Sequence, residues 1–187
     1  SIMRQDPDII LVGEIRDKET AEMAFRAAMT GHQVFTTLHT NSALGVFPRL
    51  LDIGIPPGIM AGNIIGVVAQ RLIRKLCPHC KTPYVPDDSE ALILGWREAG
   101  EPVIYQATGC DRCEGKGYRG RLALIEVLRL DTNMDELIAS GASMLSLRQA
   151  AHDRGYRPLA EDGIRHVLEG MTSLAEVSRV VDLTGRV

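Results

Sequence analysis

Residues 6–41 read DPDIILVGEIRDKETAEMAFRAAMTGHQVFTTLHTN, and they contain the clearest pattern of strands and helices in the chain. It begins with the aliphatic run Ile9–Val12, which is typical of a short buried strand. Asp17 can then cap a helix whose small and apolar residues recur at three- and four-residue spacing, and Gly31 can end that helix. A second apolar strand follows at 34–38. A strand, helix and strand of this length normally form a right-handed crossover between parallel strands, so we predict an α/β fold.

Each of the two predicted strands is followed by a residue that can carry out acid–base chemistry. Glu14 comes just after the first strand, and His39 comes just after the second. The carboxyl ends of parallel strands lie at the same edge of a sheet, where open α/β sheets bind their ligands. We therefore expect Glu14 and His39 to face the same crevice. The competing interpretations are that Glu14 is only an acidic residue at a helix start and that His39 is a structural histidine.

The four cysteines form two close pairs, Cys77-x-x-Cys80 and Cys110-x-x-Cys113. Each pair can hold a metal ion from a tight turn, and four thiolates together make the tetrahedral set that binds structural Zn²⁺. The 29 residues between the pairs exceed the commoner spacing, which is about 15 to 20 residues, so we expect this loop to carry structure of its own. The alternatives are redox or disulfide chemistry and a different metal ion.

Several segments of the chain resemble the traffic ATPases that drive type II secretion and type IV pilus assembly. The segment DPDIILVGEIRD is similar to the Walker B region of that family, and TGHQVFTTLHTN is similar to its histidine box. The segments AQRLIRKLCPHC, GCDRC, GYRGR and EDGIRHVLEGMTSLAEV follow in the family's order, so the resemblance covers nearly the whole chain. It implies the C-terminal part of a RecA-like P-loop NTPase domain, with an inserted tetracysteine zinc module and a C-terminal helical subdomain.

The resemblance also implies roles for individual residues. Glu14 is expected to orient or deprotonate the attacking water near Mg²⁺, and His39 is expected to contact the γ-phosphate of ATP. His32, Arg16 and Arg4 are the further candidates for contact with the nucleotide. His32 can equally be the first residue of a strand, and either arginine can be solvated or can face a neighbouring subunit.

A P-loop of the form G-x-x-x-x-G-K-[ST] is absent from this sequence. The chain's Gly-Lys pair is Gly115-Lys116, where Cys110 stands in place of the first glycine and Gly117 in place of the hydroxyl residue. We therefore expect the chain to be the C-terminal part of a longer protein whose P-loop lies upstream. Without that loop, this chain alone is expected to be inactive as an ATPase.

The sequence pattern changes twice along the chain, which gives three expected regions. These are the end of the ATPase core at 1–76, a zinc-binding module at 77–121 and a C-terminal helical subdomain at 122–187. Within the first region, 59–76 is interpreted as an amphipathic or buried helix. Pro48 falls where a helix after Ser42 would run, so that helix should start late or kink. A capping-box signature predicts that a helix starts at Ser173, with Glu176 as the reciprocal partner.

Composition limits the class of protein. The chain has 187 residues, of which 45% are hydrophobic, and a net charge of −3. No uninterrupted apolar run reaches the roughly 20 residues of a membrane span, and the negative charge argues against binding of nucleic acid as the main task. We therefore expect a cytoplasmic product. The resemblance implies a homo-hexamer that acts peripherally at the inner membrane with platform or adaptor proteins of the secretion or pilus machine.

The main competing function is a zinc-ribbon module without catalytic activity, which would bind a protein or a nucleic acid through its basic residues. These residues are Arg71, Arg74, Lys75, Lys81, Lys116, Arg119 and Arg121. A redox protein that uses its Cys-x-x-Cys pairs is a third interpretation.

Overall fold

The computed structural model describes residues 7–96, 100 and 102–183. These residues form two compact units, and each unit is built from two stretches of the chain. Unit 1 combines the residues up to Ala69 with Val127–Tyr156, and unit 2 combines Gln70–Glu126 with the residues from Arg157 onward. Both units contain helices and strands, which confirms the predicted α/β class.

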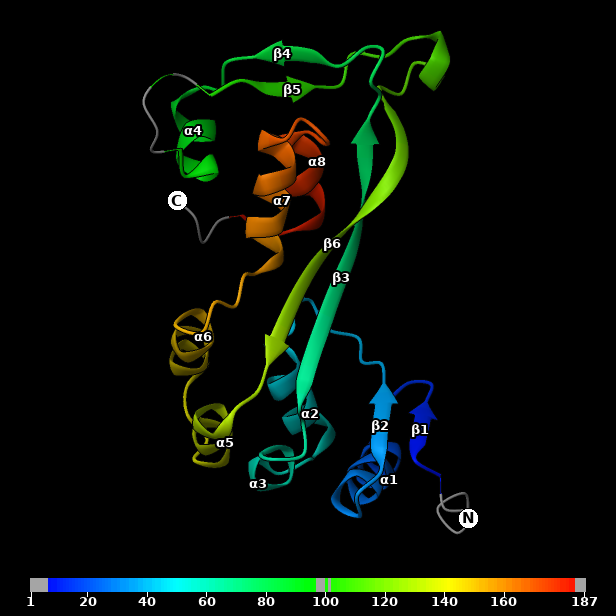
Figure 1. The fold of residues 1–187 in the computed structure, drawn as a ribbon, viewed down its shortest axis with the longest axis vertical. Coiled ribbons are helices and arrows are strands. Elements are labelled where there is room, and N and C mark those ends of the chain that lie inside the picture. Colours follow the sequence, from blue (N-terminus) through cyan, green and yellow to red (C-terminus); the bar gives the residue numbers. More distant parts are fainter. Residues whose placement is uncertain (1–6, 97–99, 101, 184–187) are drawn as a thin grey trace. The chain divides into compact units, whose positions relative to one another are not determined.

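The strand, helix and strand at the start of unit 1 form at the predicted places, but the first strand is not buried as predicted, because Ile9 and Leu11 are exposed. Strand β1 (Ile9–Val12) pairs in parallel with β2 (Gln33–Thr36), and the two strands lie side by side in Figure 1. Helix α1 (Lys18–Met29) connects them in the sequence. The Asp17 carboxylate caps this helix by accepting a hydrogen bond of 2.9 Å from the amide of Thr20. A cap of this kind satisfies one of the amides that have no partner within the helix.

Four further helices complete unit 1. Helix α2 (Val46–Ile53) begins late, so Pro48 falls in its first turn, where the missing backbone N–H has no partner to lose. This confirms the predicted effect of Pro48. The other three are α3 (Pro57–Met60), α5 (Thr132–Ala139) and α6 (Met144–His152).

The core of unit 1 draws on both of its stretches of chain. Phe25 and Leu50 come from the first stretch, and Met134 and Leu147 come from the second. All four side chains are buried in one hydrophobic cluster. Unit 1 therefore has a complete core only when both stretches are present.

The two longest strands pair with each other. These are β3 (Gly66–Leu76) and β6 (Tyr118–Arg129), which run in opposite directions in Figure 1. The prediction of a helix at 59–76 was therefore wrong for most of that segment. Its β-branched residues, such as Val67 and Val68, favour a pleated strand. The partner strand lies far away in the sequence, where a local pattern cannot reveal it.

The loop between the cysteine pairs carries structure of its own, as predicted. It contains β4 (Thr82–Tyr84), helix α4 (Asp88–Leu94) and β5 (Ile104–Gln106), and β4 pairs antiparallel with β5. A single 3₁₀ turn at Asp111–Cys113 joins the second cysteine pair. All of these elements belong to unit 2.

Two helices near the C-terminus complete unit 2, namely α7 (Leu159–Leu168) and α8 (Leu174–Val180). Val167 and Val177 on these helices are fully buried against Leu124 and other apolar residues of the same unit. In the part of the chain that the structure describes, no helix has both the length and the apolar composition needed to cross a membrane.

A buried carboxylate ties α8 to β3 within unit 2. Glu176 accepts hydrogen bonds of 3.0 Å from the backbone amide of Arg74, from the Arg74 guanidinium and from the Arg179 guanidinium. Burial alone would raise the pKa of Glu176, but the donors from Arg179 and Arg74 outweigh it and lower this pKa to about 2. Ser173 caps α8 as predicted, by accepting from the Glu176 amide at 3.2 Å. The Glu176 carboxylate binds the two arginines instead of completing the predicted capping box.

Candidate functional site

The structure brings Glu14 and His39 together at the carboxyl ends of β1 and β2. The Nε2 atom of His39 lies 2.9 Å from Oε1 of Glu14, and a guanidinium nitrogen of Arg16 lies 2.5 Å from Oε2. The Glu14 side chain is only 20% exposed, whereas the side chains of His39 and Arg16 are 85% and 75% exposed. A recessed carboxylate therefore lies between two exposed side chains that can carry positive charge.

One oxygen of this carboxylate is buried and has no hydrogen-bond donor. Among the described residues, Oε1 of Glu14 accepts no hydrogen bond, because the 2.9 Å contact with His39 does not have hydrogen-bond geometry. Buried polar atoms in proteins are almost always paired, either with protein groups or with an ordered water. A carboxylate oxygen that accepts no hydrogen bond, at the ligand-binding edge of a sheet, therefore fits a polar partner such as a water molecule.

The charge state of Glu14 follows from its neighbours. The hydrogen bond from Arg16 lowers the pKa of Glu14 below its ordinary value, and partial burial opposes this effect. The charges of Arg16 and His39 lower the pKa further. Glu14 is therefore ionised at neutral pH, and its carboxylate can accept a hydrogen bond from a water molecule.

His32 is not part of this cluster. The Nδ1 atom of His32 lies 3.0 Å from the Ala27 carbonyl oxygen and 3.0 Å from the Thr30 hydroxyl, so the ring is attached to the end of α1. His32 immediately precedes β2 at its amino end, and the four residues of that strand place its amino end roughly 13 Å from its carboxyl end. Arg4 lies outside the described residues.

One contact at this site could not be predicted from the sequence. The hydroxyl of Thr37 donates a hydrogen bond of 2.7 Å to the carbonyl oxygen of Gly13, the residue before Glu14. Thr37 follows another threonine at the end of an apolar strand. That position alone does not reveal what its hydroxyl contacts.

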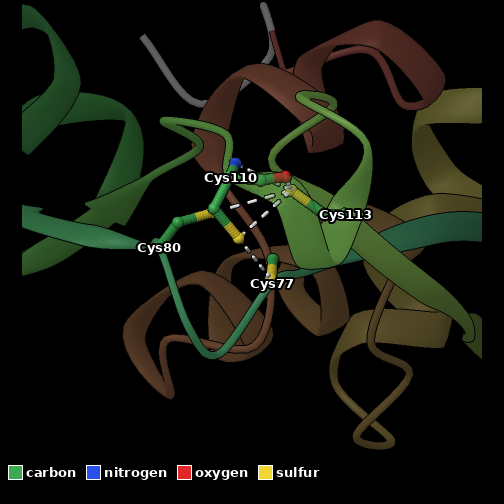
Figure 2. A group of neighbouring side chains, drawn as sticks. All are labelled: Cys77, Cys80, Cys110 and Cys113. Carbon is green, nitrogen blue, oxygen red and sulfur yellow. Dashed lines mark hydrogen bonds between the residues drawn. The ribbon is translucent and has the colours of Figure 1, made fainter.

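The four cysteines form a second cluster, which lies in unit 2. Figure 2 shows their sulfur atoms facing a common point, and all four lie within 4.8 Å of one another. The sulfur of Cys77 is 4.0 Å from that of Cys110, and the sulfur of Cys80 is 3.8 Å from that of Cys113. All four are free thiols. Their separations are far beyond a disulfide bond length of about 2 Å.

These separations fit a tetrahedral metal site. With zinc–sulfur bonds of about 2.3 Å, the edges of a tetrahedron of sulfurs are about 3.8 Å long. Backbone amides of Cys110 and Gly117 each donate to the Cys113 sulfur at 3.2 Å. Burial raises the pKa of the Cys80 thiol to about 12, whereas these amides help to lower the pKa of the Cys113 thiol to about 7 against the effect of burial. The donor set therefore suits a soft, thiolate-binding cation such as Zn²⁺.

Two glycines allow the chain to close around the cysteines. Gly109 has a φ of +102°, and a Cβ atom there would lie 2.5 Å from the Gly115 carbonyl oxygen. Gly117 has a φ of +73°, and a Cβ atom there would lie 2.6 Å from the Ala107 side chain. Residues with side chains rarely adopt such angles, and neither position has space for one.

Comparison with known proteins places the chain in a family. The family model described as "Type II/IV secretion system protein" matches residues 1–179. The chain is 47% identical to "Type II secretion system protein E" of Pseudomonas aeruginosa, over 96% of this chain and 36% of that protein. It is 48% identical to "Type IV pilus assembly ATPase TfpB" of Acinetobacter baylyi, over 98% of this chain and 32% of that protein. The chain thus spans about a third of the length of these curated relatives.

A solved structure supports the fold alone. The chain matches the X-ray structure of the Legionella pneumophila ATPase DotB with a TM-score of 0.65 and 21% sequence identity, over 96% of this chain and 40% of that one. The family match covers the β1–β2 edge with Glu14 and His39 as well as both cysteine pairs. The chain therefore belongs to the type II/IV secretion system protein family.

Proposed function

We propose that this chain is the C-terminal part of a hexameric ATPase that powers type II protein secretion or type IV pilus assembly from the cytoplasmic face of the inner membrane. Relatives of nearly half-identical sequence carry the names of a type II secretion system protein and a type IV pilus assembly ATPase, which supports this function. The observation that carries it is the recessed Glu14 carboxylate beside His39. The match over 179 residues favours this function over a separate zinc-ribbon binding module, because it extends well beyond the cysteine pairs.

In this proposal Glu14 and His39, at the carboxyl ends of β1 and β2, have separate roles in ATP hydrolysis. Glu14 orients the attacking water through Oε1, the oxygen that has no donor in this structure. Its lowered pKa makes it a weak base, so it orients the water more than it removes a proton. The His39 side chain is exposed and lies 2.9 Å from the Glu14 carboxylate, so it can contact a γ-phosphate beside the same water. Bound Mg²⁺ would supply charge neutralisation of the phosphate groups.

Arg16, His32 and Arg4 have weaker support as nucleotide contacts. Arg16 already binds Glu14 at 2.5 Å, and its exposed guanidinium can exchange this partner for a phosphate oxygen. His32 is held at the amino end of β2. We therefore propose that His32 contacts only a nucleotide that is bound by other elements of the parent protein or by a neighbouring subunit. Arg4 lies outside the described residues and stays a prediction.

The experiment that tests the function compares the 187-residue chain with the full-length protein that contains it. The full-length protein is expected to release phosphate from Mg-ATP, and the chain alone is expected to do so no faster than buffer, because it lacks a P-loop to hold the phosphates. Phosphate release would be measured for both at equal concentration. Robust turnover by the chain alone would contradict the proposed division of the active site.

We propose a structural Zn²⁺ for the four-cysteine cluster and a docking role for the strand that follows it. Arg119 and Arg121 are exposed on β6. They are two residues apart in the strand, so their side chains lie on the same face, about 7 Å apart. Neither side chain forms a hydrogen bond or an ion pair with any residue that the structure describes, whereas the Lys116 side chain is paired with Glu114 at 2.5 Å. An acidic segment of a membrane-anchored partner would complement these two arginines.

Reversal of these two charges is expected to abolish secretion or piliation. The double variant Arg119→Glu/Arg121→Glu would repel an acidic partner, so its association with inner-membrane vesicles should be lost at low salt. Zinc content and basal ATPase activity should remain within about 2-fold of the unmodified protein, because neither arginine contacts the cysteines or Glu14. The measurements are secretion or piliation, vesicle co-sedimentation and metal content.

The matched control is Arg148→Glu/Arg157→Glu, which makes the same change in net charge at two other exposed arginines. This control should retain normal assembly. If both double variants assemble normally, Arg119 and Arg121 are only a solvated face and the docking proposal is wrong.

A further inference from the structure

Thr37 lies between β2 and His39, and its contacts lie on either side of Glu14. Its hydroxyl donates to the carbonyl oxygen of Gly13 at 2.7 Å. Its own carbonyl oxygen accepts from the amide of Ile15 at 3.0 Å. Glu14 is the residue between these two attachments. Thr37 therefore holds the backbone before and after Glu14 without touching its carboxylate.

The pairing of the two strands shows why an additional attachment is needed. The β1–β2 register, continued by one residue, places Thr37 level with the residue after Val12. A regular parallel ladder would then bring the Glu14 amide to the Thr37 carbonyl oxygen. The Ile15 amide makes this bond instead. The segment after β1 therefore contains one residue more than a regular ladder with the segment after β2 would need. Irregularities of this kind occur beside active sites, where they redirect a side chain.

We infer that Thr37 is a positioning residue for Glu14, and this inference rests on the proposed ATPase function. The Thr37 hydroxyl anchors the irregular stretch of backbone that carries Glu14 to the end of β2. His39 follows two residues later on the same segment, so the anchor also sets the 2.9 Å spacing between His39 and the Glu14 carboxylate. Orientation of a water by a carboxylate depends on such spacing, since an error of about 1 Å can cost up to about 100-fold in rate.

The competing explanation is that the hydroxyl only satisfies an exposed carbonyl oxygen. Thr37 is exposed, and its hydrogen bond to Gly13 is also exposed, so loss of the hydroxyl should leave the core intact. A purely structural hydroxyl would therefore matter little for the rate of hydrolysis. A positioning hydroxyl would affect the rate more than the affinity for ATP, because the geometry at Glu14 matters mainly in the transition state.

The test uses Thr37→Val and Thr37→Ser in the full-length protein. Valine keeps the shape of threonine and removes the hydroxyl, and serine keeps the hydroxyl. Thr37→Val is expected to lower kcat roughly 10-fold with a KM for ATP within about 2-fold, and Thr37→Ser is expected to restore most of the rate. Thr36→Val is the matched control, because the Thr36 hydroxyl makes only a long contact of 3.5 Å.

A second measurement needs no nucleotide. In the 187-residue chain, the pKa of the Glu14 carboxyl can be measured by NMR of a labelled side chain. Arg16 chiefly, together with His39, holds this pKa below 4.5. Loosening of the segment in Thr37→Val should move the pKa up toward 4.5, whereas Thr37→Ser should leave it low. Unchanged melting of both variants would exclude general unfolding as the cause.

The outcomes separate this inference from the function on which it rests. If Glu14→Gln abolishes hydrolysis but Thr37→Val keeps normal kcat and normal Glu14 pKa, the positioning role is wrong and the ATPase function stands. If Glu14→Gln hydrolyses ATP normally, the proposed function of the edge is wrong. If Thr37→Ser is as slow as Thr37→Val, the hydroxyl is not the determinant and the inference fails.

Discussion

Removal of metal from the four-cysteine cluster is expected to unfold residues 77–121 and to loosen the turn between α7 and α8. The purified chain should contain about one Zn²⁺ per molecule, and a strong chelator should release it. In zinc-finger peptides such sites contribute apparent free energies of about 10–16 kcal/mol at neutral pH, which is more than the total stability of many domains. Metal content and thermal melting would be measured before and after chelation.

The effect of metal removal should reach the turn between α7 and α8 because residues beside the first cysteine pair contact that turn. The ammonium group of Lys81 donates to the Gly170 carbonyl oxygen at 2.8 Å, and the amide of Leu76 donates to the Met171 carbonyl oxygen at 2.9 Å. Loss of the metal should therefore increase amide hydrogen exchange at residues 170–173 as well as in the cysteine loops.

Two controls belong with this experiment. Addition of Zn²⁺ should restore the melting curve, and Mg²⁺ should not, because thiolates are poor ligands for Mg²⁺. His79→Ala should keep its zinc, because His79 is exposed and lies 3.2 Å from the guanidinium of Arg112. Metal-free protein with unchanged melting would end the zinc proposal.

The variant Glu14→Gln in the full-length protein is expected to bind Mg-ATP normally while its hydrolysis falls roughly 10²- to 10⁴-fold. Glutamine keeps the size of the side chain, but its neutral amide is a poorer acceptor for the hydrogen bond that orients the water. The phosphate-binding loop is unaffected, so affinity should stay within about 2-fold. Nucleotide binding and phosphate release would be measured on the same preparation.

The control for this variant is Glu19→Gln, which makes the same chemical change on the exposed first turn of α1. It should hydrolyse ATP at the normal rate. The pH profile provides a further check. Because Arg16 chiefly lowers the pKa of Glu14, the carboxylate stays ionised down to its ordinary value of 4.5, and rate loss from its protonation should occur only below that pH. Normal hydrolysis by Glu14→Gln would remove Glu14 from the catalytic machinery.

The elements that could be predicted from the sequence are those whose causes are local. The run of aliphatics in β1, the Asp17 cap and the spacing of apolar residues in α1 all lie within one short stretch. The convergence of the cysteines was also predictable, since their paired spacing itself specifies a common centre. In each case neighbouring residues supply most of the structural information.

The features that could not be predicted depend on distant partners. β3 is a strand because β6 pairs with it, and β6 begins more than 40 residues after β3 ends. Glu176 has the spacing of a capping box, but its carboxylate binds Arg74, which is 102 residues away in the sequence. The attachment of Gly13 by Thr37 likewise depends on the register of two strands. Local periodicity contains no information about such partners.

The division of each unit into two stretches of chain has a consequence for synthesis on the ribosome. Unit 1 needs Met134 and Leu147 to complete its core, so its first stretch emerges with Phe25 and Leu50 still unable to bury themselves fully. At about 5–20 residues per second, the wait between Ala69 and Tyr156 is on the order of 10 s. During that time the nascent chain exposes apolar surface that attracts chaperones, and unit 2 is meanwhile also incomplete because its own second stretch follows last. Unit 1 has both of its stretches once Tyr156 has emerged, so it is expected to fold before unit 2, whose second stretch begins at Arg157.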